Sequence, residues 1–289
     1  MTELTNPRSD RVKAVRALSG RSARLRHGQY VIEGPQALRE AVRFAPDTIR
    51  DIYLTPQAQS RYSDIYDEAE AAGLYIHVAS LEVLMAMSPD CQGLLGVAYL
   101  PQRAELSLTD ELLLGARNIA VMCSVRDPGN AGTIIRAADA AGADLVILTA
   151  GSVDVHSPKV VRSTAGSLYH LPVLTGVNFE DLISTLHTSG VQILAAAGES
   201  ALDLDDLLDE AAAAKNRTED QAGQGQASRA DLTRPTAWLF GNEAQGLSVE
   251  EKEHADFSVS VPIRGKAESL NVATAATVCL YASSRAQRR

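Results

Sequence analysis

The sequence predicts an α/β protein made of two successive units, and two observations support this. First, short apolar runs alternate with helical patterns over residues 11–100, and the same alternation restarts at Asn118. Second, the intervening residues 101–117 are polar and then helical, which is typical of a segment that links two cores. A chain of 289 residues also fits two domains better than one.

The N-terminal unit, residues 1–100, is predicted to be a small α/β sandwich, because strands and helices alternate along it. Gly73 ends one of its helical patterns and Ser80 stands where a helix N-cap belongs. Strands are expected at residues 30–32, 49–55, 75–78 and 94–99, and helices at residues 36–44, 63–72 and after Ser80.

The second unit, residues 118–289, follows the linker 101–117 and is predicted to contain a largely parallel sheet. Residues 119–123 form a nearly continuous apolar run, as expected for a strand buried on both faces. Residues 209–234 interrupt the alternation and offer little to bury, so they are expected to be a mobile insertion. Further strands are expected at residues 144–148, 171–174, 191–197, 237–240 and 257–261, and helices at residues 133–141, 158–164, 179–188 and 272–284.

The distribution of charge along the chain is compatible with a nucleic-acid partner. The net charge of −9 argues at first against a polyanion. The stretch from Arg8 to Arg26 is nevertheless strongly basic, with Asp10 as its one acidic residue. Such a stretch can neutralise phosphates, although a solvated helix face is the alternative. The candidate RNA-binding residues here are Arg16, Arg21, Arg24 and Arg26.

Missing motifs disfavour several enzyme classes. The chain has no G-x-G-x-x-G fingerprint, Walker A loop, H-E-x-x-H motif or nucleophile elbow, which disfavours a nicotinamide oxidoreductase, an NTPase and a metallohydrolase. The scattered cysteines and histidines show no ligand spacing, so no metal is expected. Without a signal peptide or a membrane-length apolar run, a cytoplasmic location is expected.

Three polar, glycine-containing segments each follow an apolar run and precede a helical pattern. Polar residues at the carboxyl ends of strands build the binding sites of α/β proteins, so these segments are expected to form one site. The segments are residues 127–132 with Arg136, residues 239–247, and residues 261–263 leading to residues 269–271.

The side chains of these segments indicate what the site could bind. Asn130 is expected to cap a helix, and Arg136 to offer a fork for a phosphate or a ribose hydroxyl. Glu243 places a carboxylate at a strand end, while Ser269 and Asn271 offer polar groups before the last helix. Taken singly, each residue also has a purely structural interpretation as a cap, turn or surface residue.

Taken together, the segments resemble the three signature motifs of the SpoU/TrmH family, the RNA ribose 2′-O-methyltransferases of the SPOUT class. The resemblance spans about residues 118–285 and includes residues 158–163 between the first two motifs. Residues 31–34 with Ala37, and residues 93–97, are similar to the L30e-like RNA-binding domain that often precedes this family's catalytic domain.

This resemblance implies a trefoil knot in the C-terminal unit, a homodimer formed by that unit, and S-adenosylmethionine as cofactor. It implies that Gly241, Val261, Ile263 and Leu270 line the cofactor site. It implies that Arg136, Asn130, Glu243, Ser269 and Asn271 form the catalytic set, with Arg136 also contacting RNA.

The resemblance further implies roles for these residues. The family's proposed base matches Arg136, but a guanidinium stays protonated, so we expect it to hold the ribose hydroxyl and an adjacent phosphate. Asn130 is expected to orient Arg136 or the ribose. The predicted substrate is 23S ribosomal RNA. A tRNA methyltransferase and a noncatalytic RNA-binding protein remain the alternatives.

Overall fold

The structure is a computed structural model that describes residues 3–101, 108–215 and 229–288. The described residues divide into two compact units. The first is drawn from Met1–Glu105 with Asp154–His170, and the second from Leu106–Val153 with Leu171–Arg289. Residues 102–107 of the expected linker lie outside the described residues.

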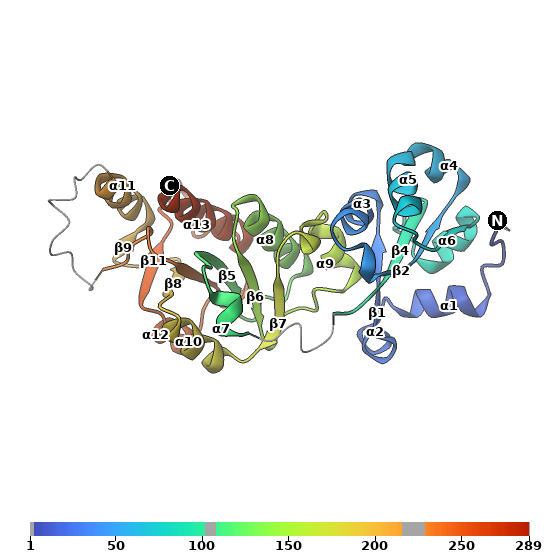
Figure 1. Ribbon diagram of the computed structural model, residues 1–289. Helices are drawn as coiled ribbons and strands as arrows, with labels where there is room; N and C mark the ends of the chain where they lie inside the picture. Colours follow the sequence, from blue (N-terminus) through green and yellow to red (C-terminus); the bar gives the residue numbers. More distant parts are fainter. Residues whose placement is uncertain (1–2, 102–107, 216–228, 289) are drawn as a thin grey trace. The chain divides into compact units, whose positions relative to one another are not determined.

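The first unit contains a four-stranded mixed sheet in the order β1-β4-β2-β3 (Figure 1). Strand β4 pairs antiparallel with β1 and β2, and β3 pairs parallel with β2. The strands are β1 (Gln29–Glu33), β2 (Ile49–Leu54), β3 (Ile76–Val78) and β4 (Leu94–Tyr99). All four expected strands are therefore present, and they belong to the α/β class that was predicted.

Helices cover both faces of this sheet because side chains alternate along each strand. Val31 belongs to a hydrophobic cluster with α1 (Asp10–Ala17) and α6 (Leu81–Met87). Its neighbour Ile32 belongs to the opposite cluster, with α3 (Pro35–Phe44) and α5 (Ser63–Ala71). Ser80 caps α6 as expected, accepting a hydrogen bond from the Val83 amide. The remaining helices of the N-terminal stretch are α2 (Arg21–His27), η1 (Pro46–Thr48) and α4 (Pro56–Arg61).

A later segment, residues 154–170, completes the first unit. It contains α9 (Pro158–Ser163) and η3 (Ser167–Tyr169), and Val161 is fully buried in the cluster with α3. The Asp154 carboxylate lies 2.7 Å from Arg24 Nη2, and Arg162 pairs with Glu33. The expected boundary put residues 154–170 with the second unit, because chain order alone places them between two of its strands.

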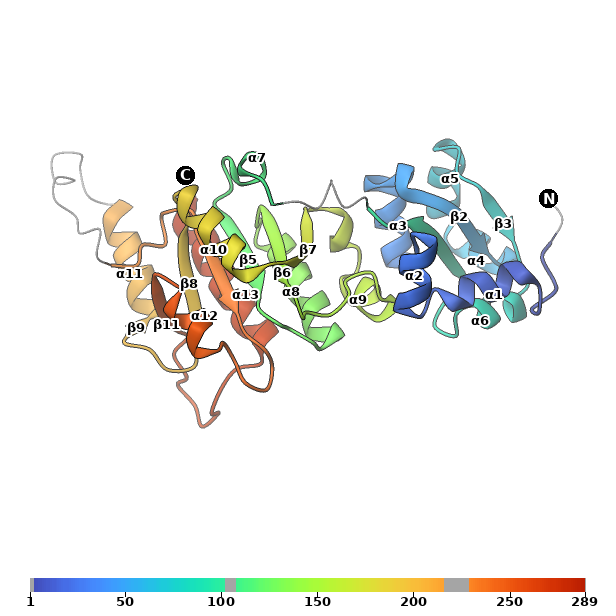
Figure 2. The ribbon, with the colours of Figure 1, turned by 90° about the horizontal axis from the view of Figure 1, so that it is seen from below.

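The second unit contains a seven-stranded parallel sheet in the order β7-β6-β5-β10-β8-β11-β9 (Figure 2). The largely parallel sheet predicted from the apolar runs is thus present. The strands are β5 (Asn118–Met122), β6 (Leu145–Thr149), β7 (Val173–Val177), β8 (Gln192–Ala197), β9 (Leu202–Asp203), β10 (Thr236–Phe240) and β11 (Phe257–Ser260).

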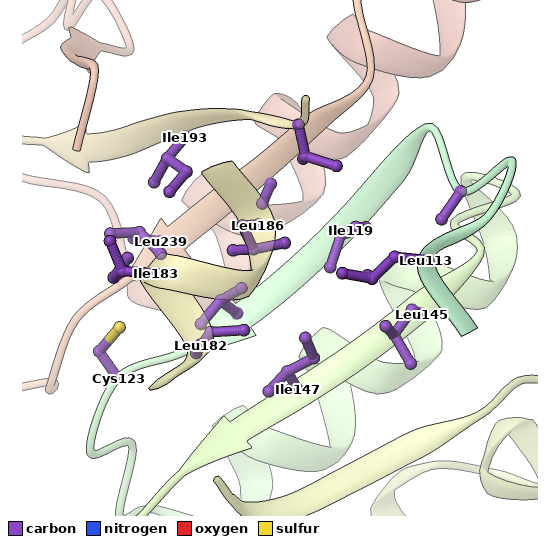
Figure 3. Close-up of a cluster of buried hydrophobic side chains, with 14 of the residues drawn as sticks. Leu113, Ile119, Cys123, Leu145, Ile147, Leu182, Ile183, Leu186, Ile193 and Leu239 are labelled. Carbon is purple, nitrogen blue, oxygen red and sulfur yellow. The ribbon is translucent and has the colours of Figure 1, made fainter. Parts of the chain in front are cut away.

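Helices pack on both faces of this sheet as well. On one face, α7 (Asp110–Leu113) and α10 (Phe179–Thr188) contribute to a buried cluster in which Leu182 and Leu186 lie against Ile119 and Ile147 (Figure 3). On the other face, α13 (Val272–Gln287) packs beside α8 (Pro128–Ala140). There the indole of the fully buried Trp238 donates to Ser283 Oγ at 2.8 Å.

Residues 209–234 were expected to be a mobile insertion, but the described part of this segment includes helical and buried residues. Residues 209–215 form the end of α11 (Leu204–Lys215), whose Leu204, Leu207 and Ala211 are buried at helical spacing. Ala230 and Leu232 are buried too, before β10. The alanine run therefore favours a helix through its high propensity. Residues 216–228 lie outside the described residues. Helix α12 (Val249–Glu253) completes the unit, and none of the described helices is long and apolar enough to cross a membrane.

Candidate functional site

The three polar segments follow strands whose carboxyl ends lie along one edge of the parallel sheet. Strand β5 precedes the first segment, β10 the second and β11 the third. Strands β5 and β10 are direct neighbours, and β8 separates β10 from β11. Parallel strands all end at the same edge, so the segments meet there although they are far apart in sequence.

The first segment begins α8 earlier than expected. Asp127 is the N-cap, its carboxylate accepting from the Asn130 amide at 2.8 Å, and Pro128 occupies the first helical position. The prediction that Asn130 caps this helix was therefore wrong. Because the helix starts at Pro128, the Asn130 side chain lies inside the first turn and can reach other loops.

The Glu243 carboxylate ties the second segment to the first. It accepts hydrogen bonds from the Asp127 amide at 2.9 Å, from the Arg126 amide at 3.3 Å and from Asn130 Nδ2 at 3.3 Å. Desolvation raises the pKa of Glu243, but hydrogen bonding to its own backbone amide together with these three hydrogen bonds outweighs it, and the net pKa lies below the ordinary value. The carboxylate is thus ionised at neutral pH and holds the two loops together.

Asn271 joins the third segment to the same network. Its Oδ1 caps α13 by accepting from the Ala273 and Thr274 amides, at 2.9 and 3.3 Å. Its Nδ2 donates to Asn130 Oδ1 at 3.0 Å. A chain of hydrogen bonds, Glu243–Asn130–Asn271, therefore connects all three segments.

Gly241 allows an unusually close approach of backbone within the second segment. Asn242 and Gly246 exchange both backbone hydrogen bonds, at 3.1 and 2.8 Å, which folds the loop back on itself. A Cβ atom on Gly241 would lie 2.2 Å from the Gly246 carbonyl carbon and 2.2 Å from the Leu247 nitrogen. No side chain fits in this space, so the position requires glycine.

Beside this network lies a cavity of about 270 Å³. It is bounded by the carboxyl ends of β8 and β10, by the segment after β11 and by the first turn of α13. Its lining includes all four residues expected to contact the cofactor, namely Gly241, Val261, Ile263 and Leu270, together with Glu243 and Ser269. Sequence reasoning did not select Ala196, Ala197, Gly198 or Glu268, which also line the cavity. The small residues at the end of β8 are the sequence signal for this wall.

Arg136 lies apart from the network within one chain. It is exposed on α8 and has no hydrogen bond or ion pair with any described residue. Six residues separate it from Asn130, about 9 Å along a helix axis. The side-chain Nδ2 and Oδ1 of Asn130 are hydrogen-bonded to Glu243 and Asn271, so the expectation that Asn130 orients Arg136 does not hold in this chain.

The basic N-terminal stretch divides into exposed and buried residues. Arg16, Arg21 and Arg26 are exposed and can face a polyanion. Arg24 is buried, pairs with Asp154 and donates to the carbonyls of Leu18 and Ser19 at 2.9 and 2.7 Å. Its expected role in RNA binding does not fit this position, because the guanidinium is fully engaged inside the unit.

The parallel sheet, with three loops converging beside a cavity at its carboxyl edge, defines a methyltransferase of the SPOUT class. The chain belongs to the SpoU rRNA Methylase family, whose model matches residues 117–281.

Similar proteins match nearly the whole chain. The 23S rRNA (guanosine(2553)-2′-O)-methyltransferase RlmP of Bacillus subtilis is 27% identical, covering 97% of this chain and 98% of that protein. The 23S rRNA (guanosine-2′-O-)-methyltransferase RlmB of Bordetella pertussis is 30% identical, over 88% and 96%.

Solved structures agree with this. An AdoMet-bound rRNA methyltransferase from Sinorhizobium meliloti is 26% identical, with a TM-score of 0.74 over 98% of this chain and 97% of that one. The AviRb methyltransferase from Streptomyces viridochromogenes, in complex with AdoMet, is also 26% identical, with a TM-score of 0.73 over 96% and 98%.

Proposed function

We propose that this protein transfers a methyl group from S-adenosylmethionine to a ribose 2′-hydroxyl of 23S ribosomal RNA. The observation that carries the proposal is the hydrogen-bonded chain Glu243–Asn130–Asn271 beside the cavity. Relatives over nearly the full length are named as 23S rRNA 2′-O-methyltransferases, and neighbouring structures contain AdoMet. A tRNA substrate is the alternative.

The cavity suits S-adenosylmethionine. Its walls are mainly small and apolar, and its volume of about 270 Å³ is close to the lower end of the range for small-molecule sites. Gly241 lines the cavity, and its lack of a side chain lets the backbone of Gly246 and Leu247 pack directly against it to form the wall. We assign Gly241, Val261, Ile263 and Leu270 to the cofactor. S-adenosylmethionine, when bound, supplies a methyl group already activated on a sulfonium.

The remaining chemical task is to position the ribose and to help its weakly acidic hydroxyl lose a proton. Positioning of bound reactants can supply roughly 7–11 kcal/mol in favourable cases. Arg136, which stays protonated, holds the 2′-oxygen and a neighbouring phosphate and stabilises developing negative charge. The proton passes to phosphate or water. Asn130, Glu243, Ser269 and Asn271 keep the loops around the ribose in place.

The site is completed across a homodimer formed by the second unit. In one chain Arg136 has no described partner, and it lies on α8, which packs beside α13. Val278 and Tyr281 of α13 are apolar in character yet 39% and 45% exposed. A second copy covering this helix pair would bury them and bring Arg136 to the partner's cofactor. Sedimentation should give a dimer, and Val278→Glu should give an inactive monomer; a fully active monomer would refute the assembly.

The first unit serves as the RNA-binding domain, with the L30e-like fold that its sequence resembles. Its mixed sheet with helices on both faces is compatible with that assignment. Arg16, Arg21 and Arg26 supply exposed positive charge. The trefoil knot of the family, a domain division at residues 101–117 with residues 154–170 joined to the first domain, and a cytoplasmic location are further parts of this proposal.

The test combines cofactor binding with methyl transfer. Isothermal titration should show S-adenosylmethionine binding to the purified protein, which a noncatalytic scaffold need not show. Unmodified 23S rRNA and a tRNA pool should then be incubated with methyl-labelled cofactor, and the product mapped by resistance to alkaline cleavage at the methylated ribose. Label in tRNA alone would move the substrate to tRNA, and absence of both binding and transfer would refute the proposal.

A further inference from the structure

A second cavity, of about 300 Å³, lies against the other side of the loop that bounds the cofactor cavity. Asn242, Ala244 and Gly246 line both cavities, so residues 242–246 act as a shared wall. The second cavity also borders Ser124 and Arg126, which follow β5. A molecule held there would therefore lie next to the site of methyl transfer.

The two charged side chains that line this cavity, Arg126 and Glu251, each have hydrogen-bonding groups without a partner among the described residues. Glu251 belongs to the capping box of α12, in which its Oε2 accepts from the Ser248 amide at 2.7 Å. Its Oε1 has no partner among the described residues, and neither does the Arg126 guanidinium. One carboxylate oxygen and one guanidinium thus remain free in the same cavity.

The cavity wall is held in a strained conformation. Ser124 has a φ of 53°, a left-handed conformation that non-glycine residues rarely adopt. Its carbonyl accepts from Asn242 Nδ2 at 2.9 Å, which ties the loop after β5 to the loop after β10. Strain of this kind persists where surrounding contacts enforce it and is concentrated at binding sites. The cavity is therefore formed before any ligand arrives.

We infer that this second cavity receives the base of the target nucleotide and selects guanine. The inference rests on the proposed function and adds the identity of the base. Guanine presents two adjacent donors, N1–H and the N2 amine, and the N2 amine can donate to the free Oε1 of Glu251, while its O6 and N7 accept from an arginine fork. Adenine and cytosine put an acceptor nitrogen beside their amine, and uracil flanks its single donor with carbonyls. Glu251 and Arg126 are therefore the specificity-determining residues.

The experiment compares guanosine with inosine, which lacks only the N2 amine, at the mapped methylation site of a synthetic RNA fragment. Full-length wild-type protein and three variants are assayed for kcat/KM with both RNAs. Glu251→Gln keeps the capping box, because glutamine also serves at that position, but replaces a carboxylate oxygen by an amide. Arg126→Gln removes the fork. Glu250→Gln, on the same helix but outside the cavity, is the matched control.

We expect wild type and Glu250→Gln to prefer guanosine over inosine by about tenfold or more, in line with a good base contact. Glu251→Gln should reduce this ratio to about threefold or less. Arg126→Gln should lower kcat/KM for both RNAs by about tenfold with unchanged affinity for S-adenosylmethionine.

The possible failures separate two ideas. Methylation at a uridine, adenosine or cytidine, or equal rates for guanosine and inosine, would overturn the guanine assignment and leave the proposed function standing. Full discrimination by Glu251→Gln would remove that residue from base selection. No methyl transfer to any RNA by the wild-type protein would overturn both.

Discussion

Replacing Gly241 by alanine tests whether the folded-back loop shapes the cofactor cavity. The added Cβ would meet backbone atoms of Gly246 and Leu247 at 2.2 Å and the Gly246 carbonyl oxygen at 2.5 Å. Backbone cannot rotate away as a side chain can, so the loop must shift. Overpacking of this kind costs about 1–3 kcal/mol, and contacts this short favour the upper end.

Two consequences follow from a cost of about 3 kcal/mol. If the loop keeps its native conformation despite the clash, the melting temperature should fall by about 6–12 °C. If the loop moves instead, the native cavity becomes a minor conformation, and affinity for S-adenosylmethionine should fall at least about tenfold and up to about a hundredfold. Differential scanning calorimetry and isothermal titration measure the two effects.

The matched control is Gly265→Ala, because a Cβ there meets nothing within 4 Å and its φ is not positive. It should change neither quantity measurably. If Gly241→Ala melts at the wild-type temperature and binds S-adenosylmethionine within twofold of wild type, the close approach has no role in shaping the cavity.

Three further predictions concern charged and titratable side chains. Burial lowers the pKa of His156 to about 4 in the folded protein, against about 6.5 in the unfolded chain. Between these two pH values the unfolded state binds more protons, so the free energy of unfolding falls as the pH drops from 6.5 towards 4. Urea unfolding should show a loss of about 2 kcal/mol by pH 5 in the wild type, and His156→Gln should not show this loss. Arg24→Met should cost about 3 kcal/mol by leaving Asp154 unpaired, whereas Arg21→Met should leave the melting temperature unchanged and weaken RNA binding in filter assays. Arg136→Lys should lower turnover at least about tenfold with cofactor affinity unchanged; near-normal turnover would rule out a fork.

Much of the fold could be predicted because the strands are continuous apolar runs in the sequence. The run at residues 119–123 and the small, apolar run at 191–197 are buried strands that differ from the predicted bounds by a residue or so. Burial on both faces leaves few alternatives to a parallel strand. The convergence of the polar segments at one sheet edge followed from the same reasoning.

Tertiary partners explain what the sequence could not reveal. Arg24 looks like its basic neighbours in sequence, and only the fold brings it to Asp154, 130 residues away. Asn130 resembled a cap because asparagine is a good one, but Asp127 followed by Pro128 is a stronger start signal. Local preference identifies candidates for such roles, and long-range contacts decide among them.

The placement of residues 154–170 affects biosynthesis. The first unit lacks Val161 in its core, and Arg24 lacks its counter-ion, until this segment has been translated. By then β5 and β6 of the second unit have already been translated. The first unit therefore cannot complete its core before synthesis of the second unit has begun. A gene divided at residues 101–117 would give a first unit that lacks residues 154–170 and a second product that carries this segment without its partners.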